Sequence, residues 1–223
     1  MARRAGKLRH ALVAGMLAML VAAPALAEVR LAALGDSLTQ GFGLAQGEGL
    51  VPQLEGWLVD QGHSVTVLNA GVSGDTTAGG LSRLDWTLGD SPDAMLVALG
   101  GNDLLRGIAP AASRANLDAI LRGLAEADVP ALLVGLPAPG NYGPEYQAEF
   151  EAMYRELAET HDVMLHPDLL QPITARNQAG ESVSDLMQDD NIHPNAAGVA
   201  LIVESLGPVV SDFLDTIAPE PDT

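Results

Sequence analysis

The sequence contains no cysteine and few basic residues, and each shortage excludes a class of protein or site. Without cysteine there is no disulfide, no thiolate nucleophile, no zinc–thiolate cluster and no cysteine-linked lipid anchor. Lysine and arginine together number 11 against 29 aspartate and glutamate residues, which gives a formal net charge of −18 at pH 7. Binding to nucleic acid through a basic surface needs a positive face that neutralises phosphates, so we expect no nucleic-acid partner.

The chain has enough apolar material to fold around a core. It is 223 residues long, 48% hydrophobic and 18% charged, which is typical of a globular protein and not of a disordered tail. The length predicts one domain, or at most two small ones. We expect the folded part to be a monomer.

The first 27 residues have the pattern of a cleaved signal peptide. A basic start is followed by an uninterrupted run of apolar and small residues, Ala11–Ala23, and by the small-x-small sequence Ala25-Leu26-Ala27. The alternative is a membrane anchor, but a spanning helix needs about 20 apolar residues. We therefore predict export to the periplasm or the medium and no stable membrane anchor. Removing residues 1–27 takes the net charge to −22, and such a surface repels anionic headgroups and polyanions.

The remaining chain alternates apolar runs with helix-like stretches, and this alternation predicts the fold. The expected strands are Val29–Leu34, Ser64–Leu68, Ala94–Leu99, Ala131–Leu136 and, more weakly, Val163–Leu165. The expected helices are Val51–Gln61, Thr77–Leu88, Ser113–Ala127, Glu145–His161 and a last apolar helix ending near Ile217, which Gly207-Pro208 should break or kink. Strands alternating with helices predict an α/β fold whose parallel sheet of about five strands carries helices on both faces. Residues 218–223 are expected to be disordered.

In such sheets ligands bind beyond the carboxyl ends of the strands, so the polar residues that follow the strands are candidate site residues. Ser37 follows the first strand and Asn102 follows the third. Gly74 lies in a glycine-rich turn after the second, which allows a close backbone approach. Each has a plainer interpretation: Ser37 as a helix cap, the Gly74 turn as an ordinary loop and Asn102 as a turn cap. The functional alternative for Asn102 is an amide that donates to a developing oxyanion.

A fourth candidate is the segment from Asp189 to Pro194, just before the last predicted helix. Asp190 and His193 are three residues apart, and on a helical turn that spacing places side chains side by side. The carboxylate can then hold the Nδ1–H of the imidazole and leave Nε2 free to act as a base. The alternative is a pair of surface residues at a helix start. The other histidines of the mature chain, His63, His161 and His166, are expected to have structural roles.

Taken together and in order, these blocks resemble a known family. Gly35-Asp36-Ser37-Leu38, the turn at Gly74, Gly101-Asn102-Asp103 and Asp190-x-x-His193 resemble the four blocks of the SGNH hydrolases, also called GDSL esterases. The strings Asn141-Tyr142-Gly143 and Met187-Gln188-Asp189-Asp190 are similar to the bacterial branch of arylesterases, acyl-thioesterases and lysophospholipases. The resemblance covers nearly the whole mature chain. It implies a flavodoxin-like three-layer α/β/α domain over residues 28–217.

The resemblance also implies roles for individual residues. Ser37 would be the nucleophile, His193 the general base and then acid, and Asp190 the residue that orients His193. The oxyanion hole would consist of the backbone N–H groups of Ser37 and Gly74 and the side-chain amide of Asn102. No metal, nucleotide or organic cofactor is implied. The sequence also lacks the HExxH, GxxxxGK[ST] and GxSxG motifs of metalloproteases, P-loop proteins and α/β-hydrolases.

The expected activity is hydrolysis of carboxylic esters, and possible substrates include aryl esters, thioesters and lysophospholipids. The partner is thus a small-molecule or lipid ester. Acyl-CoA is disfavoured, because an exported enzyme would seldom meet it and the acidic surface would repel it. The clearest local departures from the family, at Pro139-Gly140 and Arg176–Ser184, adjoin the expected acyl-chain region. Two alternatives remain open: a carbohydrate O-acetylesterase, and a non-catalytic periplasmic binding or adaptor protein that retains the fold.

Overall fold

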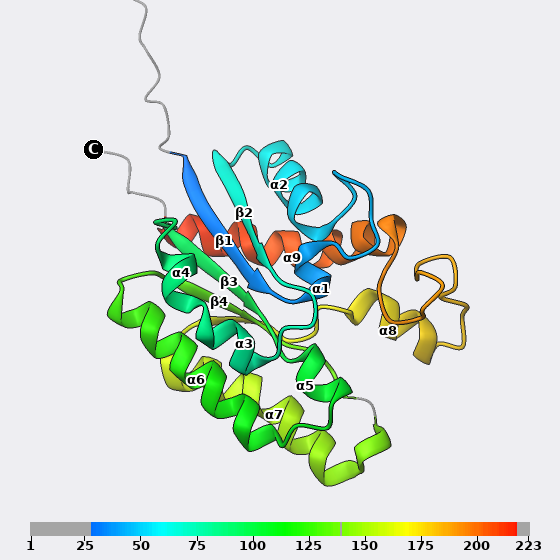
Figure 1. Cartoon of the computed structure of the whole chain (residues 1–223). Coiled ribbons are helices and arrows are strands. Elements are labelled where there is room, and N and C mark those ends of the chain that lie inside the picture. Colours follow the sequence, from blue (N-terminus) through cyan, green and yellow to red (C-terminus); the bar gives the residue numbers. More distant parts are fainter. Residues whose placement is uncertain (1–27, 139, 218–223) are drawn as a thin grey trace, which may run out of the picture.

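A five-stranded parallel sheet forms the centre of the computed structural model, which describes residues 28–138 and 140–217 (Figure 1). The strands are β1 (Val29–Gly35), β2 (Val65–Gly71), β3 (Ala94–Ala98), β4 (Ala131–Val134) and β5 (Met164–His166). Their spatial order is β2-β1-β3-β4-β5, with every neighbouring pair parallel. The chain moves outward in one direction from β1 to β2 and in the other from β3 to β5. The carboxyl ends of β1 and β3 therefore lie at the point where ligands bind in sheets of this kind.

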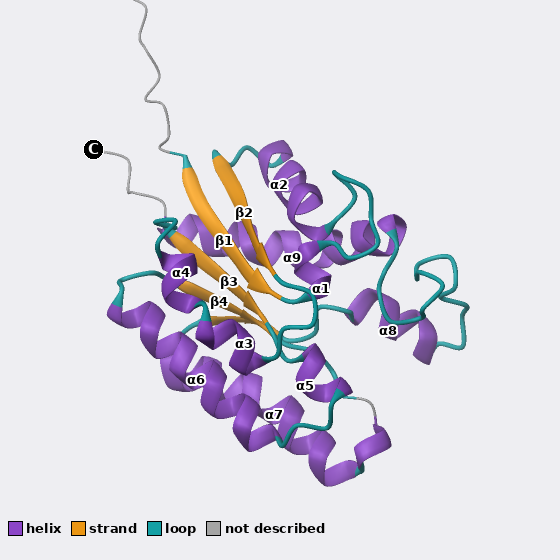
Figure 2. Cartoon of the chain, viewed as in Figure 1, coloured by secondary structure: helices purple, strands orange, loops and turns teal. Residues whose placement is uncertain are grey.

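Helices cover both faces of this sheet (Figure 2). The side chains of β1 pack alternately into the two cores that these helices form with the sheet. Leu31 and Ala33 point into a core shared with α2 (Leu50–Asp60) and α9 (Ala196–Ile217). Ala32 and Leu34 point the other way, into a core shared with α6 (Pro110–Glu126) and α7 (Pro144–His161). Strands buried on both faces read as continuous apolar runs, which is how they appear in the sequence. The predicted three-layer α/β/α fold is confirmed.

Short helical segments complete the fold. They are α1 (Ser37–Gln40), α3 (Thr77–Ser82), α4 (Leu84–Leu88), α5 (Gly101–Leu105), α8 (Gln171–Gln178) and a 3₁₀ turn at Gly140–Tyr142. The single helix predicted over Thr77–Leu88 is wrong, because the chain bends at Arg83 (φ −117°, ψ 14°) and forms α3 and α4 instead. Gly79 and Gly80 weaken the helix just before this bend.

Of the break or kink predicted at Gly207-Pro208 in the last helix, the break does not occur. Helix α9 runs without interruption from Ala196 to Ile217 with Pro208 inside it. Proline removes the hydrogen bond to the carbonyl four residues earlier, here that of Glu204. Both Glu204 and Pro208 are exposed, so water can bind the carbonyl that Pro208 leaves free. The buried side chains on the other face of α9 pack against the sheet and α2 and hold the helix in place.

Among the described residues, α9 is long and apolar enough to cross a membrane by length and composition, but half of that apolar window is buried within the fold. This burial is what the core helix of a folded domain shows. The predicted signal peptide at residues 1–27 and the predicted disordered tail at residues 218–223 lie outside the described residues.

Candidate active site

The sharp turn from β1 into α1 determines where Ser37 lies. Asp36 caps the helix, because its Oδ1 accepts a hydrogen bond from the backbone N–H of Leu38 at 3.0 Å. Ser37 is therefore the first residue of α1 and is not its cap. A Cβ on Gly35 would lie 1.9 Å from the Thr39 side-chain oxygen, so only glycine lets α1 fold back so closely on the strand. The plainer interpretation of Ser37 as a helix cap is thus wrong.

A continuous hydrogen-bonded line joins Ser37, His193 and Asp190. His193 Nε2 lies 2.9 Å from Ser37 Oγ, and His193 Nδ1 lies 2.6 Å from Asp190 Oδ2. These residues come from opposite ends of the described chain, and the fold brings them together over the carboxyl end of β1. A carboxylate on Nδ1 favours the imidazole tautomer whose Nε2 is free to accept a proton.

The spacing argument for Asp190 and His193 gave the right pair for a wrong reason. The two residues lie in a loop and not on a helical turn, and Asn191 between them has φ 55°. Asp190 Oδ1 accepts hydrogen bonds from the backbone N–H groups of Ile192 at 2.9 Å and His193 at 3.0 Å. These bonds fold the loop so that the second carboxylate oxygen meets the imidazole.

The hydrogen bonds around Asp190 also hold it ionised. They lower its pKa to about 2, first through the backbone N–H of His193, then through the His193 side chain and the backbone N–H of Ile192. The neighbouring Asp189 is exposed, and only its backbone carbonyl is engaged in this loop, as the acceptor for Asn191 Nδ2 at 3.3 Å. The carboxylate that meets His193 is therefore that of Asp190.

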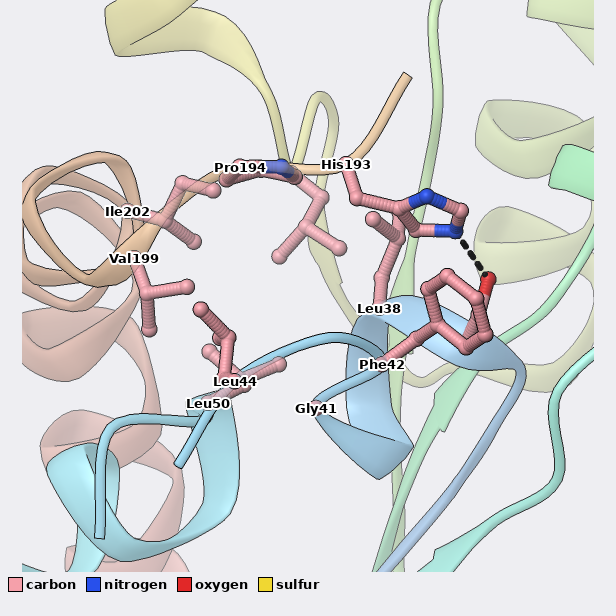
Figure 3. A pocket seen from close by; sticks show the side chains of 11 residues that line it. Leu38, Gly41, Phe42, Leu44, Leu50, His193, Pro194, Val199 and Ile202 are labelled. Atoms are coloured by element: carbon pink, nitrogen blue, oxygen red, sulfur yellow. Dashed lines mark hydrogen bonds between the residues drawn. The ribbon is translucent and has the colours of Figure 1, made fainter. Parts of the chain in front are cut away.

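Two further residues hold His193 in place, and sequence reasoning assigned no role to either. The Phe42 ring packs against the imidazole with the ring centroids 4.7 Å apart (Figure 3). Gln188 donates from its side-chain amide to the carbonyls of Phe42 at 2.8 Å and Pro194 at 3.0 Å. Its backbone N–H donates to the His193 carbonyl at 2.8 Å. Gln188 thus ties the loop after α1 to the loop that carries His193.

Asn102 lies at the start of α5, next to the Ser37 turn. Its side-chain amide donates to Asp36 Oδ2 at 3.3 Å, so Asp36 holds both the α1 backbone and Asn102. Asp36 is only 2% exposed, and this burial raises the pKa of its carboxyl group. The adjacent Asp103 is fully buried and accepts hydrogen bonds from Thr77 N, Thr77 Oγ1 and Ser113 Oγ. These bonds anchor α5 to α3 and α6.

Gly74 lies in the exposed turn after β2. Its φ of +85° belongs to the left-handed region that glycine adopts without strain. The Gly74 carbonyl accepts a hydrogen bond from Arg106 Nη2 at 2.8 Å. The Asp75 N–H donates to the Val72 carbonyl at 3.1 Å, which closes the turn. The structure therefore brings all three strand-end candidates to one edge of the sheet.

A cleft of about 390 Å³ opens over these residues. Its polar lining comprises Asp36, Ser37, Ser73, Gly74, Asn102, Asn141 and His193, and its larger apolar side chains are Leu38, Phe42, Leu104, Leu105, Leu136, Pro137, Tyr142, Leu170 and Ile192. A second, narrow apolar slot of about 20 Å³ lies behind Phe42 and His193, between α1, α2 and α9 (Figure 3). Four residues line both spaces and form the wall between the cleft and the slot: Ser37, Leu38, Phe42 and His193.

The two departures from the family pattern differ in their relation to this cleft. Asn141 and Tyr142, which follow Pro139-Gly140, line it, while Pro139 itself lies outside the described residues. Arg176–Ser184 contributes no residue to its lining, so the expectation that this stretch adjoins the acyl-chain region finds no support in the cleft.

The remaining histidines lie outside the cleft lining. His161 contacts Asp118 Oδ1 at 2.8 Å, a pairing that spacing along the chain did not indicate. His63 Nε2 contacts Ser211 Oγ at 2.6 Å, and His166 is buried on β5. Over residues 28–138 and 140–217, no group of three or more histidine, aspartate or glutamate side chains is placed to hold a metal ion.

Comparison with known proteins places this arrangement among related enzymes. Residues 33–201 match the GDSL-like lipase/acylhydrolase family. The chain is 35% identical to the esterase TesA of Pseudomonas aeruginosa over 208 residues, which cover 93% of this chain and all of that protein. It is 40% identical to the thioesterase 1/protease 1/lysophospholipase L1 of Escherichia coli K12 over 164 residues, 73% of this chain and 74% of that one.

A solved esterase structure is also similar to this chain. The psychrotrophic esterase EstA from Pseudoalteromonas sp., in a form inhibited by monoethylphosphonate, is similar with a TM-score of 0.75 at 32% identity. The match covers 83% of this chain and 98% of that one. The match over residues 33–201, the relatives above 30% identity and the shared fold lead to one conclusion: this chain belongs to the GDSL-like lipase/acylhydrolase family.

Proposed function

We propose that this protein is a serine esterase that hydrolyses carboxylic esters through an acyl-enzyme on Ser37. One observation carries the proposal: Ser37, His193 and Asp190 form a hydrogen-bonded line that opens onto a cleft lined by Gly74 and Asn102. A nucleophile, a base and an orienting carboxylate in this order are what acyl transfer requires. The family membership supports the same chemistry.

Acylation begins at Ser37 Oγ. His193 Nε2, 2.9 Å away, takes the hydroxyl proton as the oxygen attacks the ester carbonyl. Asp190 holds Nδ1–H and stabilises the imidazolium that forms, and its low pKa keeps it a carboxylate at neutral pH. His193 then gives the proton to the departing alcohol. Deacylation repeats these steps with water as the nucleophile and restores Ser37.

The developing negative oxygen needs donors that are already in place. Ser37 lines the cleft from the first turn of α1, where helical N–H groups have no partner within the helix. The backbone N–H of Gly74 and the Nδ2 amide of Asn102 come from two other strand ends lining the same cleft. We assign these three groups to the oxyanion hole.

The proposed substrates are esters with an apolar acyl or alcohol group, including aryl esters, lysophospholipids and thioesters. The cleft supports this assignment, because Leu104, Leu105, Leu136, Tyr142 and Ile192 give it an apolar lining. Its volume of about 390 Å³ exceeds what a pocket restricted to acetyl groups needs. A carbohydrate O-acetylesterase is therefore the less favoured assignment.

Rates of hydrolysis along a series of p-nitrophenyl esters test the substrate class. The cleft predicts a higher kcat/KM for the C8 ester than for the C2 ester, with lysophosphatidylcholine also cleaved. Acetylated xylan serves as the comparison substrate. A preference for C2 together with rapid deacetylation of the polysaccharide would favour the O-acetylesterase instead.

Asn102→Ala should lower kcat by about 10²–10³, the usual cost of removing one oxyanion donor. KM should change little, because the ground-state carbonyl gains less from this donor than the transition state does. Steady-state kinetics and the melting temperature are measured on the same preparation. Asn116→Ala is the matched control, since Asn116 bonds Thr77 Oγ1 at 3.0 Å and does not line the cleft. A folded Asn102→Ala enzyme with wild-type kcat would leave Asn102 only a role in the turn.

We further propose that the mature protein begins at Glu28 after export to the periplasm or medium. The basic start, the short apolar run and Ala25-Leu26-Ala27 support this. Intact-mass measurement on protein recovered from the periplasm and the medium should give the chain from Glu28 to Thr223. A full-length product recovered only from the membrane fraction would show that residues 1–27 act as an anchor.

A further inference from the structure

The Arg83 side chain connects three segments close to the candidate oxyanion hole in sequence. It lies at the bend between α3 and α4, and its side chain is 19% exposed. Nε donates to Asp75 Oδ2 at 2.6 Å, Nη1 to the Ala70 carbonyl at 2.8 Å and Nη2 to the Gly35 carbonyl at 2.8 Å. One guanidinium thus bonds the carboxyl ends of β1 and β2 and the loop that follows β2.

These three bonds use the distinctive geometry of arginine. The guanidinium is planar and presents its N–H groups in a rigid fork, so three acceptors in fixed directions can be satisfied at once. A lysine ammonium is a compact point charge on a flexible stem and does not reproduce the fork. The ion pair with Asp75 is partly buried, which strengthens it relative to a surface pair.

The segments that Arg83 joins carry two of the proposed oxyanion donors. Gly35 immediately precedes Asp36 and Ser37, and Asp75 immediately follows Gly74. The Gly35 carbonyl also accepts the Val72 N–H at 3.0 Å, so the two strand ends already touch. On the other side of the turn, Arg106 holds the Gly74 carbonyl. Arg83 itself does not line the cleft.

We propose that Arg83 is a positioning residue, which sets the backbone N–H of Gly74 at the right place relative to Ser37 without touching substrate. This inference rests on the proposed serine-esterase mechanism. Because a misplacement of about 1 Å can cost a factor of about 10² in rate, removing Arg83 should weaken catalysis more than ground-state binding. A backbone donor cannot be deleted by a side-chain substitution, so Arg83 offers a way to test the Gly74 N–H.

The test compares Arg83→Lys and Asp75→Asn with the wild-type enzyme. Arg83→Lys keeps the charge but not the fork, and should lower kcat by about 10- to 100-fold, less than the loss of a whole oxyanion donor. Asp75→Asn keeps an acceptor of the same shape and should lower kcat by a smaller factor. KM should change by less than about threefold in both, since uniform binding is retained. Arg122→Met is the control, because Arg122 is an exposed arginine paired with Asp118 on α6 and far in sequence from this loop.

A second readout separates positioning from simple stabilisation. An alkyl boronic acid that forms a tetrahedral adduct with serine mimics the transition state, so its Ki should rise by the same factor by which kcat/KM falls. A structural role alone would lower the melting temperature and leave both quantities unchanged per folded active site. Wild-type kcat and boronate Ki in a folded Arg83→Lys enzyme would overturn the inference. If that variant does not fold, the same outcome in Asp75→Asn overturns it.

Failure of the inference and failure of the proposed function give different results. The proposed function fails if the wild-type enzyme neither hydrolyses esters nor reacts at Ser37. The inference about Arg83 fails only when the wild-type enzyme does both and the variants match it in kcat and in boronate Ki.

Discussion

Ser37→Ala should abolish ester hydrolysis while leaving the fold intact. Loss of the nucleophile in another serine hydrolase lowers kcat by about 10⁶, and only the background supplied by substrate binding and the oxyanion donors remains. Ser37 is partly exposed at the first turn of α1, and Asp36 supplies the cap, so the substitution costs the fold little. Activity is followed with a p-nitrophenyl ester, and folding by circular dichroism.

The chain offers a matched control for this substitution. Ser211 on α9 also contacts a histidine, with its Oγ 2.6 Å from His63 Nε2, but neither residue lines the cleft. Ser211→Ala should therefore retain wild-type kcat. Residual activity of Ser37→Ala within tenfold of wild type would remove Ser37 from the nucleophile role.

The second large effect is expected from Asp190→Asn. In another serine hydrolase, replacing the orienting carboxylate by its amide leaves the geometry intact and lowers kcat by about 10⁴, because the wrong imidazole tautomer is favoured. Asp190 meets His193 Nδ1 at 2.6 Å, so the same loss should follow here. The measurement is kcat at neutral pH on protein whose fold is checked in parallel.

Asp189→Asn is the control, because it removes one negative charge from the same loop at the residue next to Asp190. Its side chain is exposed, and the loop engages Asp189 through its backbone carbonyl, so kcat should stay within a few-fold of wild type. Equal losses in the two variants, or a larger loss in Asp189→Asn, would reassign the partner of His193.

Much of the fold could be predicted because its signal is local. Strands buried on both faces must be apolar throughout, and the helices between them repeat apolar residues every three or four positions. The failures lie where distant parts of the chain decide the local structure. The division of Thr77–Leu88 into two helices places Arg83 where it can reach carbonyls of β1 and β2, which no pattern within that segment reveals. Pro208 stays inside α9 because tertiary packing outweighs one lost hydrogen bond.

The site residues also divide into those that local sequence patterns predict and those that depend on distant contacts. Ser37 and Asn102 were accessible from the sequence, because parallel strands bring their carboxyl ends to one edge and the two residues follow those strands. His193 was accessible through its spacing from Asp190. Gln188 and Phe42 were not, although both hold His193. Gln188 acts through bonds between its side chain and backbone carbonyls, and Phe42 through a tilted ring contact with His193 about 150 residues away along the sequence. Such contacts leave no spacing rule along the chain.

The most direct test of the account is covalent labelling by a fluorophosphonate, followed by peptide mass spectrometry. Fluorophosphonates react with a serine whose hydroxyl is activated by a neighbouring base, so the reagent reports the Ser37–His193 contact itself. The account predicts one adduct per chain, located on Ser37, with esterase activity lost in proportion to labelling and no adduct in Ser37→Ala. Full esterase activity after exhaustive treatment, or an adduct on a different residue that tracks the loss of activity, would contradict it.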